Sequence, residues 1–198
     1  MRIAVLPFSA HEGTPPALGR QFAAFAGDQI RAATDTEVNN VSYLAQQEGE
    51  DGVRMGFVNL GDSMLQDDQV QDLAQQASVE LVMDGTVQEQ DGNFDVGLRF
   101  HHIGSEEPSQ LEEFKFTKAE LFQTLHKIVK RLGAEAKLEL PETLSGDTME
   151  FGTDDADAFL SFLIGYDSFT YIQQAEGRVV RYICRTGWRS ALAPSASP

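Results

Sequence analysis

The sequence contains a single cysteine, Cys184, among its 198 residues. One thiol permits no intramolecular disulfide and no zinc site built from cysteine ligands. The chain also lacks any apolar run near the ~18 residues that a membrane-spanning helix needs, and its first residues lack the pattern of a signal peptide. We therefore expect a cytoplasmic protein that has no membrane partner.

Basic residues are scarce as well. The 15 Lys and Arg residues are outnumbered by 31 Asp and Glu residues, which gives a formal net charge of -16. Proteins that bind a nucleic-acid backbone need clustered lysine and arginine side chains, which release counterions from the phosphates. This composition argues against nucleic acid as a partner and suits basic partners instead.

The charge changes sign near the end of the sequence. Every Asp and Glu lies at or before Glu176, whereas Arg178, Arg181, Arg185 and Arg189 follow it. Residues 177–198 therefore form a basic tail, and the helical periodicity of the preceding segment is lost there. We consider two interpretations: a truncated or frame-shifted end, or a genuine tail that docks on an acidic surface or on nucleic acid.

Sequence patterns of catalysis and cofactor binding are missing. The glycine-rich residues 49–61 contain neither G-x-G-x-x-G nor G-x-x-x-x-G-K-[ST], and no serine lies in a G-x-S-x-G context. We therefore expect no catalytic residues, no cofactor and no metal, and a non-enzymatic protein.

Two short patterns have some likeness to metal sites. Asp91, Asn93 and Asp95 have the first spacings of a calcium loop, but the required glycine and the closing glutamate are misplaced, so a hairpin turn is the better interpretation. His101 and His102 are adjacent in a predicted strand, and their side chains should point to opposite faces and share no metal. We expect one of them on the solvent face and one at an edge.

Residues 79–100 carry the clearest structural signal. Apolar residues alternate with mostly polar ones on both sides of Asp91-Gly92-Asn93, a pattern that predicts two strands joined by a tight turn. Further strands are predicted at residues 3–8, 37–44, 55–60 and 111–117, and helices at residues 18–33, 66–77, 118–138 and 154–175. The sequence therefore predicts an α/β fold, with helices packed on a mixed sheet.

The predicted organisation has four parts. Residues 1–140 form the mixed α/β domain, residues 141–152 a linker, residues 153–176 a repeat-type helix, and residues 177–198 the basic tail. Thr153, Asp154 and Asp155 are candidates for capping the last helix. That helix is apolar almost all round, so it must be covered on more than one side.

The last helix supplies the candidate site. One interpretation is that it packs back on the domain's own sheet. The interpretation we favour is that it forms a partner or dimer surface, because its aromatic residues exceed the need of one core. The predicted partner-binding residues are Phe159, Phe162, Leu163, Tyr166 and Phe169.

Four segments carry a family resemblance: IAVLPF at residues 3–8, VELVMDGTV at residues 79–87, a hairpin strand ending near Gly104, and DAFLSFLIGYDSF at residues 157–169. They resemble the TolB amino-terminal-like domain that precedes tetratricopeptide repeats in many bacterial cytoplasmic regulators, cyclases and kinases. In the last segment, the positions of the Ala-Tyr-x-x-Tyr-Leu-x-Gly pattern that opens the first repeat are taken by Ala158, Phe159, Phe162, Leu163 and Gly165. The resemblance covers about residues 1–176. It implies a module used for assembly or regulation, without consensus catalytic residues.

The sequence thus favours a protein-interaction or regulatory module that scaffolds assembly through its C-terminal helix, with a protein partner or a homodimer. The alternative is a domain that senses a small molecule or nucleotide near the C-terminal end of the strand at residues 3–8, where α/β sheets place their ligands. An enzyme is the least favoured class.

Overall fold

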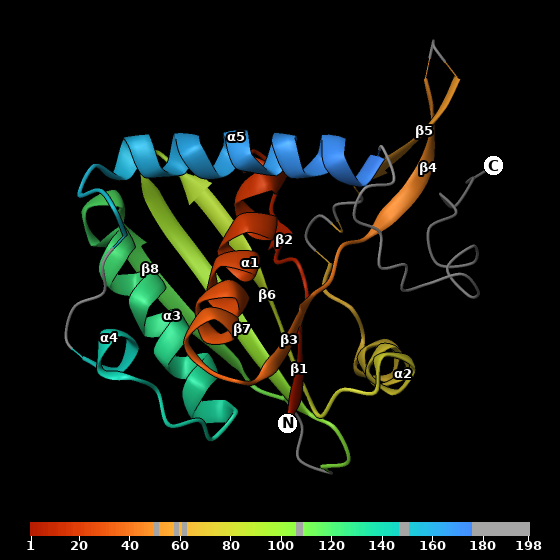
Figure 1. Cartoon of the computed structure of the whole chain (residues 1–198). Helices are drawn as coiled ribbons and strands as arrows, with labels where there is room; N and C mark the ends of the chain where they lie inside the picture. Colours follow the sequence, from red (N-terminus) through yellow and green to blue (C-terminus); the bar gives the residue numbers. More distant parts are fainter. Residues whose placement is uncertain (50–51, 58–59, 61–62, 106–108, 147–150, 176–198) are drawn as a thin grey trace.

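The computed structural model describes residues 1–49, 52–57, 60, 63–105, 109–146 and 151–175. These residues form a mixed α/β fold, in which a six-stranded sheet carries helices on both faces (Figure 1). The strands of this sheet are β1 (Arg2–Val5), β2 (Ser9–Ala10), β3 (Glu37–Asn40), β6 (Leu81–Gln90), β7 (Asn93–His102) and β8 (Leu111–Thr117). A separate hairpin consists of β4 (Leu44–Gly49) and β5 (Gly52–Phe57). The helices are α1 (Pro16–Ala33), α2 (Asp67–Ala77), α3 (Leu121–Glu135), α4 (Glu142–Ser145) and α5 (Ala156–Ala175), with a 3-10 turn, η1 (Lys118–Glu120), before α3.

The sheet combines a parallel and an antiparallel part. Its strand order is β3-β1-β6-β7-β8, and β2 pairs with β6 beyond the end of β1. The pairs of β1 with β3 and β6 are parallel, whereas β6, β7 and β8 form an antiparallel meander. The strand predicted at residues 3–8 is thus shorter in the structure, where β1 ends at Val5 and β2 begins only at Ser9. Pro7 lies between them and has no N–H to donate to a ladder.

The hairpin predicted at residues 79–100 is confirmed as β6 and β7. Asp91 and Gly92 form its turn with φ values of 54° and 78°. Two consecutive positive φ values define the type I′ turn, whose twist matches that of the flanking strands. The residues that have some likeness to a calcium loop thus form a turn and the start of a strand.

One face of the sheet is covered by α1, α3 and α5, which share a single apolar core with the strands. The alternating residues of the hairpin supply its sheet side, among them Leu81, Met83 and Leu98, which are completely buried. The opposite face is covered by α2 over a smaller apolar cluster that includes Leu6, Val70 and Val82. The helices are therefore distributed unequally, and α5 belongs to the more heavily covered side (Figure 1).

The segment predicted as a linker contains structure of its own. Residues 142–145 form α4, and Leu144 inserts into the main core with 4% of its surface exposed. The backbone carbonyl of Leu144 lies 2.9 Å from Nε2 of the buried His126 on α3. Helix α5 also joins this core, because it packs on α1 and contributes Phe159, Leu160 and Leu163. The predicted boundary at residue 140 thus falls inside a continuous core.

The start of α5 is fixed by the predicted caps. Oδ1 of Asp155 accepts hydrogen bonds from the backbone N–H groups of Asp157 and Ala158, and Oγ1 of Thr153 accepts one from Asp155. These acceptors satisfy N–H groups that a helix leaves open in its first turn. The helix consequently begins at Ala156. The basic tail at residues 177–198 lies outside the described residues.

Candidate functional site

The inner face of α5 is held by aromatic rings from three other parts of the chain. Phe159 contacts Phe25 of α1, Phe122 of α3 and Phe151 in the segment before α5, with ring centroids 6.0, 5.3 and 5.7 Å away. Phe159 is 6% exposed, and Leu163, one turn further along, is 4% exposed. This face of the helix is therefore part of the domain core.

A buried ion pair fixes the rotation of α5 about its own axis. Asp167 is 5% exposed, and its carboxylate accepts two hydrogen bonds from the guanidinium of Arg20 on α1, at 2.9 and 2.8 Å. The side-chain amide of Gln21 donates a third hydrogen bond at 3.0 Å. Because two-point arginine–carboxylate contacts are directional, this arrangement decides which side chains of α5 face outward.

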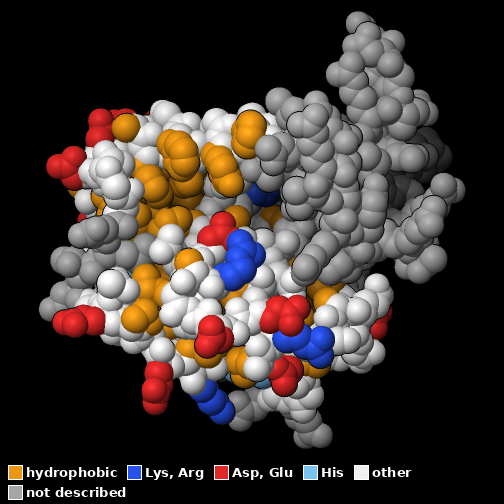
Figure 2. Space-filling view, in the orientation of Figure 1, with side chains coloured by type: hydrophobic (Ala, Val, Ile, Leu, Met, Phe, Trp, Pro, Cys, Tyr) orange, Lys and Arg blue, Asp and Glu red, His pale blue; other side chains and the backbone are white. Residues whose placement is uncertain are grey.

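The outward side chains include three aromatic rings in a row. Phe162 is 61% exposed, Tyr166 48% and Phe169 54%, and Figure 2 shows hydrophobic side chains gathered along this helix. The rings of Phe162 and Tyr166 stack with centroids 5.8 Å apart, and those of Tyr166 and Phe169 lie 6.4 Å apart. We call these three residues the aromatic stripe. Single exposed apolar residues are normal, whereas a contiguous apolar patch marks a binding surface.

The stripe borders small residues on the outer side of α5. Ala158, Ser161, Gly165 and Ser168 are exposed there. A side chain built at Gly165 would meet no other atom within 4 Å, so the space above its backbone is open. The only charged residue between positions 158 and 169 is the buried Asp167. Between positions 158 and 169, the outer side of α5 is therefore uncharged and has both bulky and small positions.

This geometry divides the five residues predicted to contact a partner. Phe162, Tyr166 and Phe169 lie together on the surface, and their role in binding stays a prediction. Phe159 and Leu163 do not lie with them: both are buried in the domain core, where Phe159 packs against α1 and α3. The cause is the rotation of α5, which the sequence of a helix that is apolar all round does not reveal.

The position predicted for a small-molecule site, at the end of β1, has little space. The depression there is lined by Pro7, Phe8, Ser9, Pro16, Arg20, Tyr43 and Leu60 and leaves no room for a water-sized molecule. The charged member of this lining, Arg20, is already bound to Asp167. Nothing in this part of the described chain favours a bound ligand.

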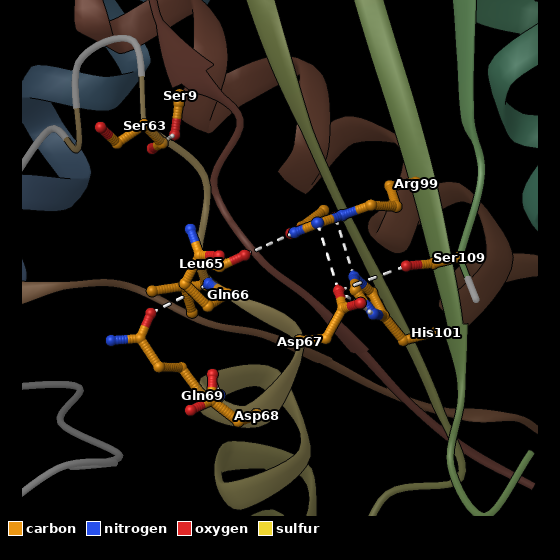
Figure 3. A network of polar contacts seen from close by, with 11 residues as sticks. Ser9, Ser63, Leu65, Gln66, Asp67, Asp68, Gln69, Arg99, His101 and Ser109 are labelled. Carbon is orange, nitrogen blue, oxygen red and sulfur yellow. Dashed lines mark hydrogen bonds and ion pairs between the residues drawn. The ribbon is translucent and has the colours of Figure 1, made fainter. Parts of the chain in front are cut away.

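A charged network lies on the opposite face of the sheet (Figure 3). Asp84 on β6 and Arg99 on β7 are direct cross-strand partners, and the guanidinium donates two hydrogen bonds to the carboxylate at 3.0 and 2.6 Å. Arg99 also donates to the carbonyl of Leu65 at 2.7 Å and to Asp67 at 3.3 Å. The network thus joins the hairpin to the segment that enters α2.

His101 takes part in the same network. Its Nε2 lies 3.2 Å from Asp84, and its Nδ1 lies 3.7 Å from Asp67. Burial raises the pKa of Asp84, but the hydrogen bonds from His101 and Arg99 outweigh it and hold that pKa below its ordinary value. The hydrogen bond to Asp84 raises the pKa of Arg99, although burial acts in the opposite direction. Ser109 belongs to the same network, and its hydroxyl donates a hydrogen bond to Asp67 at 3.4 Å. The arrangement clamps the hairpin to the segment that enters α2.

The two adjacent histidines lie on opposite faces of the sheet, as predicted. His102 faces α3, with its Nε2 2.7 Å from Oε2 of Glu135. The expectation of a solvent-facing and an edge position is wrong for His101, which is 7% exposed. Sequence reasoning missed the network, although one signal was available. Asp84 is the single acid in the apolar run of β6, and Arg99 is the single arginine of β7. Counting residues outward from the turn at Asp91-Gly92 places the two opposite each other.

The fold and the surface of α5 define a mixed α/β domain with an exposed aromatic helix face. No family model and no curated protein matches this sequence. Among solved structures, the chain is similar to a PelC dodecamer from Paraburkholderia phytofirmans, with 12% identity, a TM-score of 0.43, and coverage of 70% of this chain and 88% of that one. It is also similar to protein VC0702 from Vibrio cholerae, with 11% identity, a TM-score of 0.28, and coverage of 85% and 96%. None of the described helices combines the length and apolarity that crossing a membrane requires.

Proposed function

We propose that this protein is a non-enzymatic, cytoplasmic interaction module that scaffolds assembly by binding a protein partner on the outer side of α5. The observation that carries the proposal is the aromatic stripe, in which three neighbouring rings are each about half exposed. Full burial of a large apolar side chain stabilises a complex by roughly 1.5–3 kcal/mol. Three such rings therefore offer enough energy to offset part of the entropy lost on association.

The attachment of α5 supports the same proposal. Its inner face is fixed by the ring cluster around Phe159 and by the pair of Asp167 with Arg20, so the stripe is presented by a rigid element. A preorganised surface loses less ordering entropy when it binds. The resemblance to TolB amino-terminal-like domains, in which a helical repeat scaffold follows, agrees with a role for α5 in assembly.

The test is site-specific photocrosslinking in the cells that naturally produce the protein. A benzophenone amino acid replaces Phe169 in the stripe, and the matched control carries it at Leu111 of β8, which is also exposed, at 45%. We expect a protein crosslink from position 169 that is absent from position 111 and is lost when Phe162→Asp is added. Equal crosslinking at the two positions, or none at position 169, would contradict the proposal.

A further inference from the structure

We propose that the open edge of β8 pairs with β8 of a second copy of this chain, antiparallel about a twofold axis at Phe114, so that the two sheets join into one. This inference goes beyond the proposed function, because α5 takes no part in the contact. Strand β8 is the last strand on its side of the sheet, and among the described strands only β7 pairs with it. A strand edge with unpaired backbone groups is a template for a further strand.

The pairing of β7 with β8 shows which backbone groups point to the open edge. The N–H of Lys118 donates to the carbonyl of Gly92 at 2.9 Å, and this bond continues the ladder of the two strands by one residue. Successive residues of an antiparallel strand bond alternately to one side and to the other. The even-numbered residues of β8 therefore bond to β7, whereas the N–H and C=O groups of Glu113 and Lys115 point away from it.

The two edges of the sheet differ in how the chain protects them. The N–H of Thr117, at one end of β8, donates to Oε2 of Glu120 at 2.9 Å. At the opposite edge of the sheet, the carbonyl of Val38 in the four-residue β3 accepts a hydrogen bond from Arg31 at 3.2 Å. Among the described residues, the seven-residue β8 is thus the longer edge, and its central backbone groups are the ones that can receive another strand.

The side chains of β8 are complementary to those of a reversed copy. With the axis at Phe114, Glu113 lies directly opposite Lys115 of the second copy, and the same pair forms again on the other side of the axis. Directly opposite residues share one face of the sheet, with Cβ atoms about 4.5–5.5 Å apart, and opposite charges at these positions stabilise the pairing. Glu113 and Lys115 are 57% and 68% exposed, so both side chains are free to meet a second copy.

Contacts within one chain leave Glu113 available for this pairing. Lys115 lies 2.9 Å from Asp95 but 3.6 Å from Glu113, so Glu113 is the more weakly held of the two carboxylates. Lys115 of the second copy would supply Glu113 with another ammonium group. Both groups are exposed, so the pair contributes mainly to register.

The opposite face of β8 also tolerates a second copy. Phe114 is half-buried against the core, and its ring would lie beside the ring of Phe114 from the other chain. Glu112 would lie opposite Phe116, but its carboxylate already accepts a hydrogen bond from Arg131 on α3, at 2.6 Å. The pairing therefore places no unpaired charge on this face.

The net charge of -16 opposes the association of two copies. At physiological ionic strength this repulsion is screened over about 8 Å, whereas backbone hydrogen bonds and cross-strand pairs act at shorter range. A single pair of strands also buries less than the roughly 1,200 Å² typical of stable complexes. We therefore expect a weak, reversible dimer.

Sedimentation velocity of the full chain over a range of concentrations, in about 0.15 M salt, measures this equilibrium. We expect the wild type to shift from 21.8 kDa towards twice that mass as its concentration rises. Glu113→Lys and Lys115→Glu should each weaken the dimer at least about fivefold, because each places like charges opposite one another. The double variant restores opposite charges and should restore the dissociation constant of the wild type.

The charge variants separate strand pairing from a general effect of net charge. Glu113→Lys makes the chain less negative and Lys115→Glu makes it more negative, whereas the double variant keeps the net charge of the wild type. If net charge alone controlled association, Glu113→Lys would strengthen the dimer. Such a result, or a double variant that does not recover, would overturn the proposal. Urea unfolding of each variant checks that the chain stays folded.

Disulfide trapping locates the axis. In a Cys184→Ser background, Phe114→Cys should give a covalent dimer on mild oxidation. The two copies of position 114 form a non-hydrogen-bonded pair with Cα atoms about 4.5 Å apart, within the reach of a disulfide. Glu112→Cys is the matched control on the same face, because its two copies would lie four residues apart along the strands, about 13 Å. A disulfide at position 112 but not at 114 would overturn the axis.

The outcomes also separate this inference from the proposed function. Phe162→Asp, on α5, should leave this dimer unchanged, and a dimer that is lost in Phe162→Asp but kept in both single charge variants would overturn the inference. Leu111 lies opposite Thr117 of the second copy, so a crosslink from position 111 would join two copies of this chain and have twice its mass. A chain that stays monomeric at every concentration but crosslinks a different protein from position 169 refutes the second copy and leaves the proposed function intact.

Discussion

The two sides of α5 have similar amino-acid compositions but differ in how far their side chains are exposed. Phe159 and Phe162 are three residues apart, yet the first is 6% exposed and the second 61%. The inner side meets rings from α1, α3 and the preceding segment, whereas the outer side carries a row of exposed rings. The comparison shows that the direction in which an aromatic residue of this helix points decides whether it is buried in the core or exposed on the surface.

The largest expected effect is the loss of a ring from the inner side. Phe159→Ala should lower the free energy of unfolding by about 3–5 kcal/mol, because the substitution removes buried apolar surface and leaves a cavity among three other rings. Urea denaturation followed by circular dichroism measures this change. A loss below about 1 kcal/mol would mean that α5 is not part of the core.

Breaking the ion pair that orients α5 should have the next largest effect. Asp167→Ala leaves the guanidinium of Arg20 and the amide of Gln21 without their acceptor, and we expect a loss of about 3 kcal/mol in unfolding free energy. The matched control is Asp157→Ala on the same helix, whose pair with Lys118 is solvent-exposed. Equal losses in the two variants would contradict the role assigned to Asp167.

A variant of the charged network on the other sheet face tests the contribution of charge to stability with little change in packing. Asp84→Asn should cost about 2 kcal/mol at neutral pH, because Arg99 and His101 lose a charged acceptor. The pKa of Asp84 is lower in the folded state than in the unfolded state. Ionised Asp84 therefore stabilises the folded protein fully above the unfolded-state pKa of about 3.9. This stabilisation is lost as the pH falls through the lower folded-state pKa.

Unfolding measurements on the wild type and Asp84→Asn between pH 7 and pH 2 check this sign. The difference in stability between the two proteins should shrink below about pH 4. The difference between the wild type and Phe159→Ala should stay nearly constant, since no titratable group lies in that ring cluster. If the stability difference between the wild type and Asp84→Asn grew on acidification, it would contradict the lowered pKa of Asp84 in the folded state.

The smallest effect on stability is expected on the outer side of α5. Phe162→Ala should change the unfolding free energy by no more than about 0.5 kcal/mol, because the ring is already mostly in water. The same substitution should weaken partner binding at least tenfold. Phe162→Ala and Phe159→Ala together test the difference between the outer and the inner side of α5. If both variants lowered the unfolding free energy equally, the two sides would not differ in their contribution to stability.

Local patterns predicted much of the fold. The hairpin of β6 and β7, the strand β8 and the helices α1, α2 and α5 lie close to the predicted positions, because alternation and helical periodicity are properties of neighbouring residues. The short helix α4 was missed inside a segment read as a linker, since four residues carry too little periodicity. Leu144, at 4% exposed, is recognised only through its contact with the core.

The candidate site was predicted in part. The sequence by itself determined that α5 is a helix with more aromatic residues than one apolar face needs, and that Asp167 is the only charged residue between positions 158 and 169. Only the tertiary structure decided that Phe159 and Leu163 point inward while Phe162, Tyr166 and Phe169 point outward. A helix that is apolar all round has no preferred rotation of its own. That rotation is set by contacts with residues distant in the sequence, the rings of Phe25 and Phe122 and the guanidinium of Arg20.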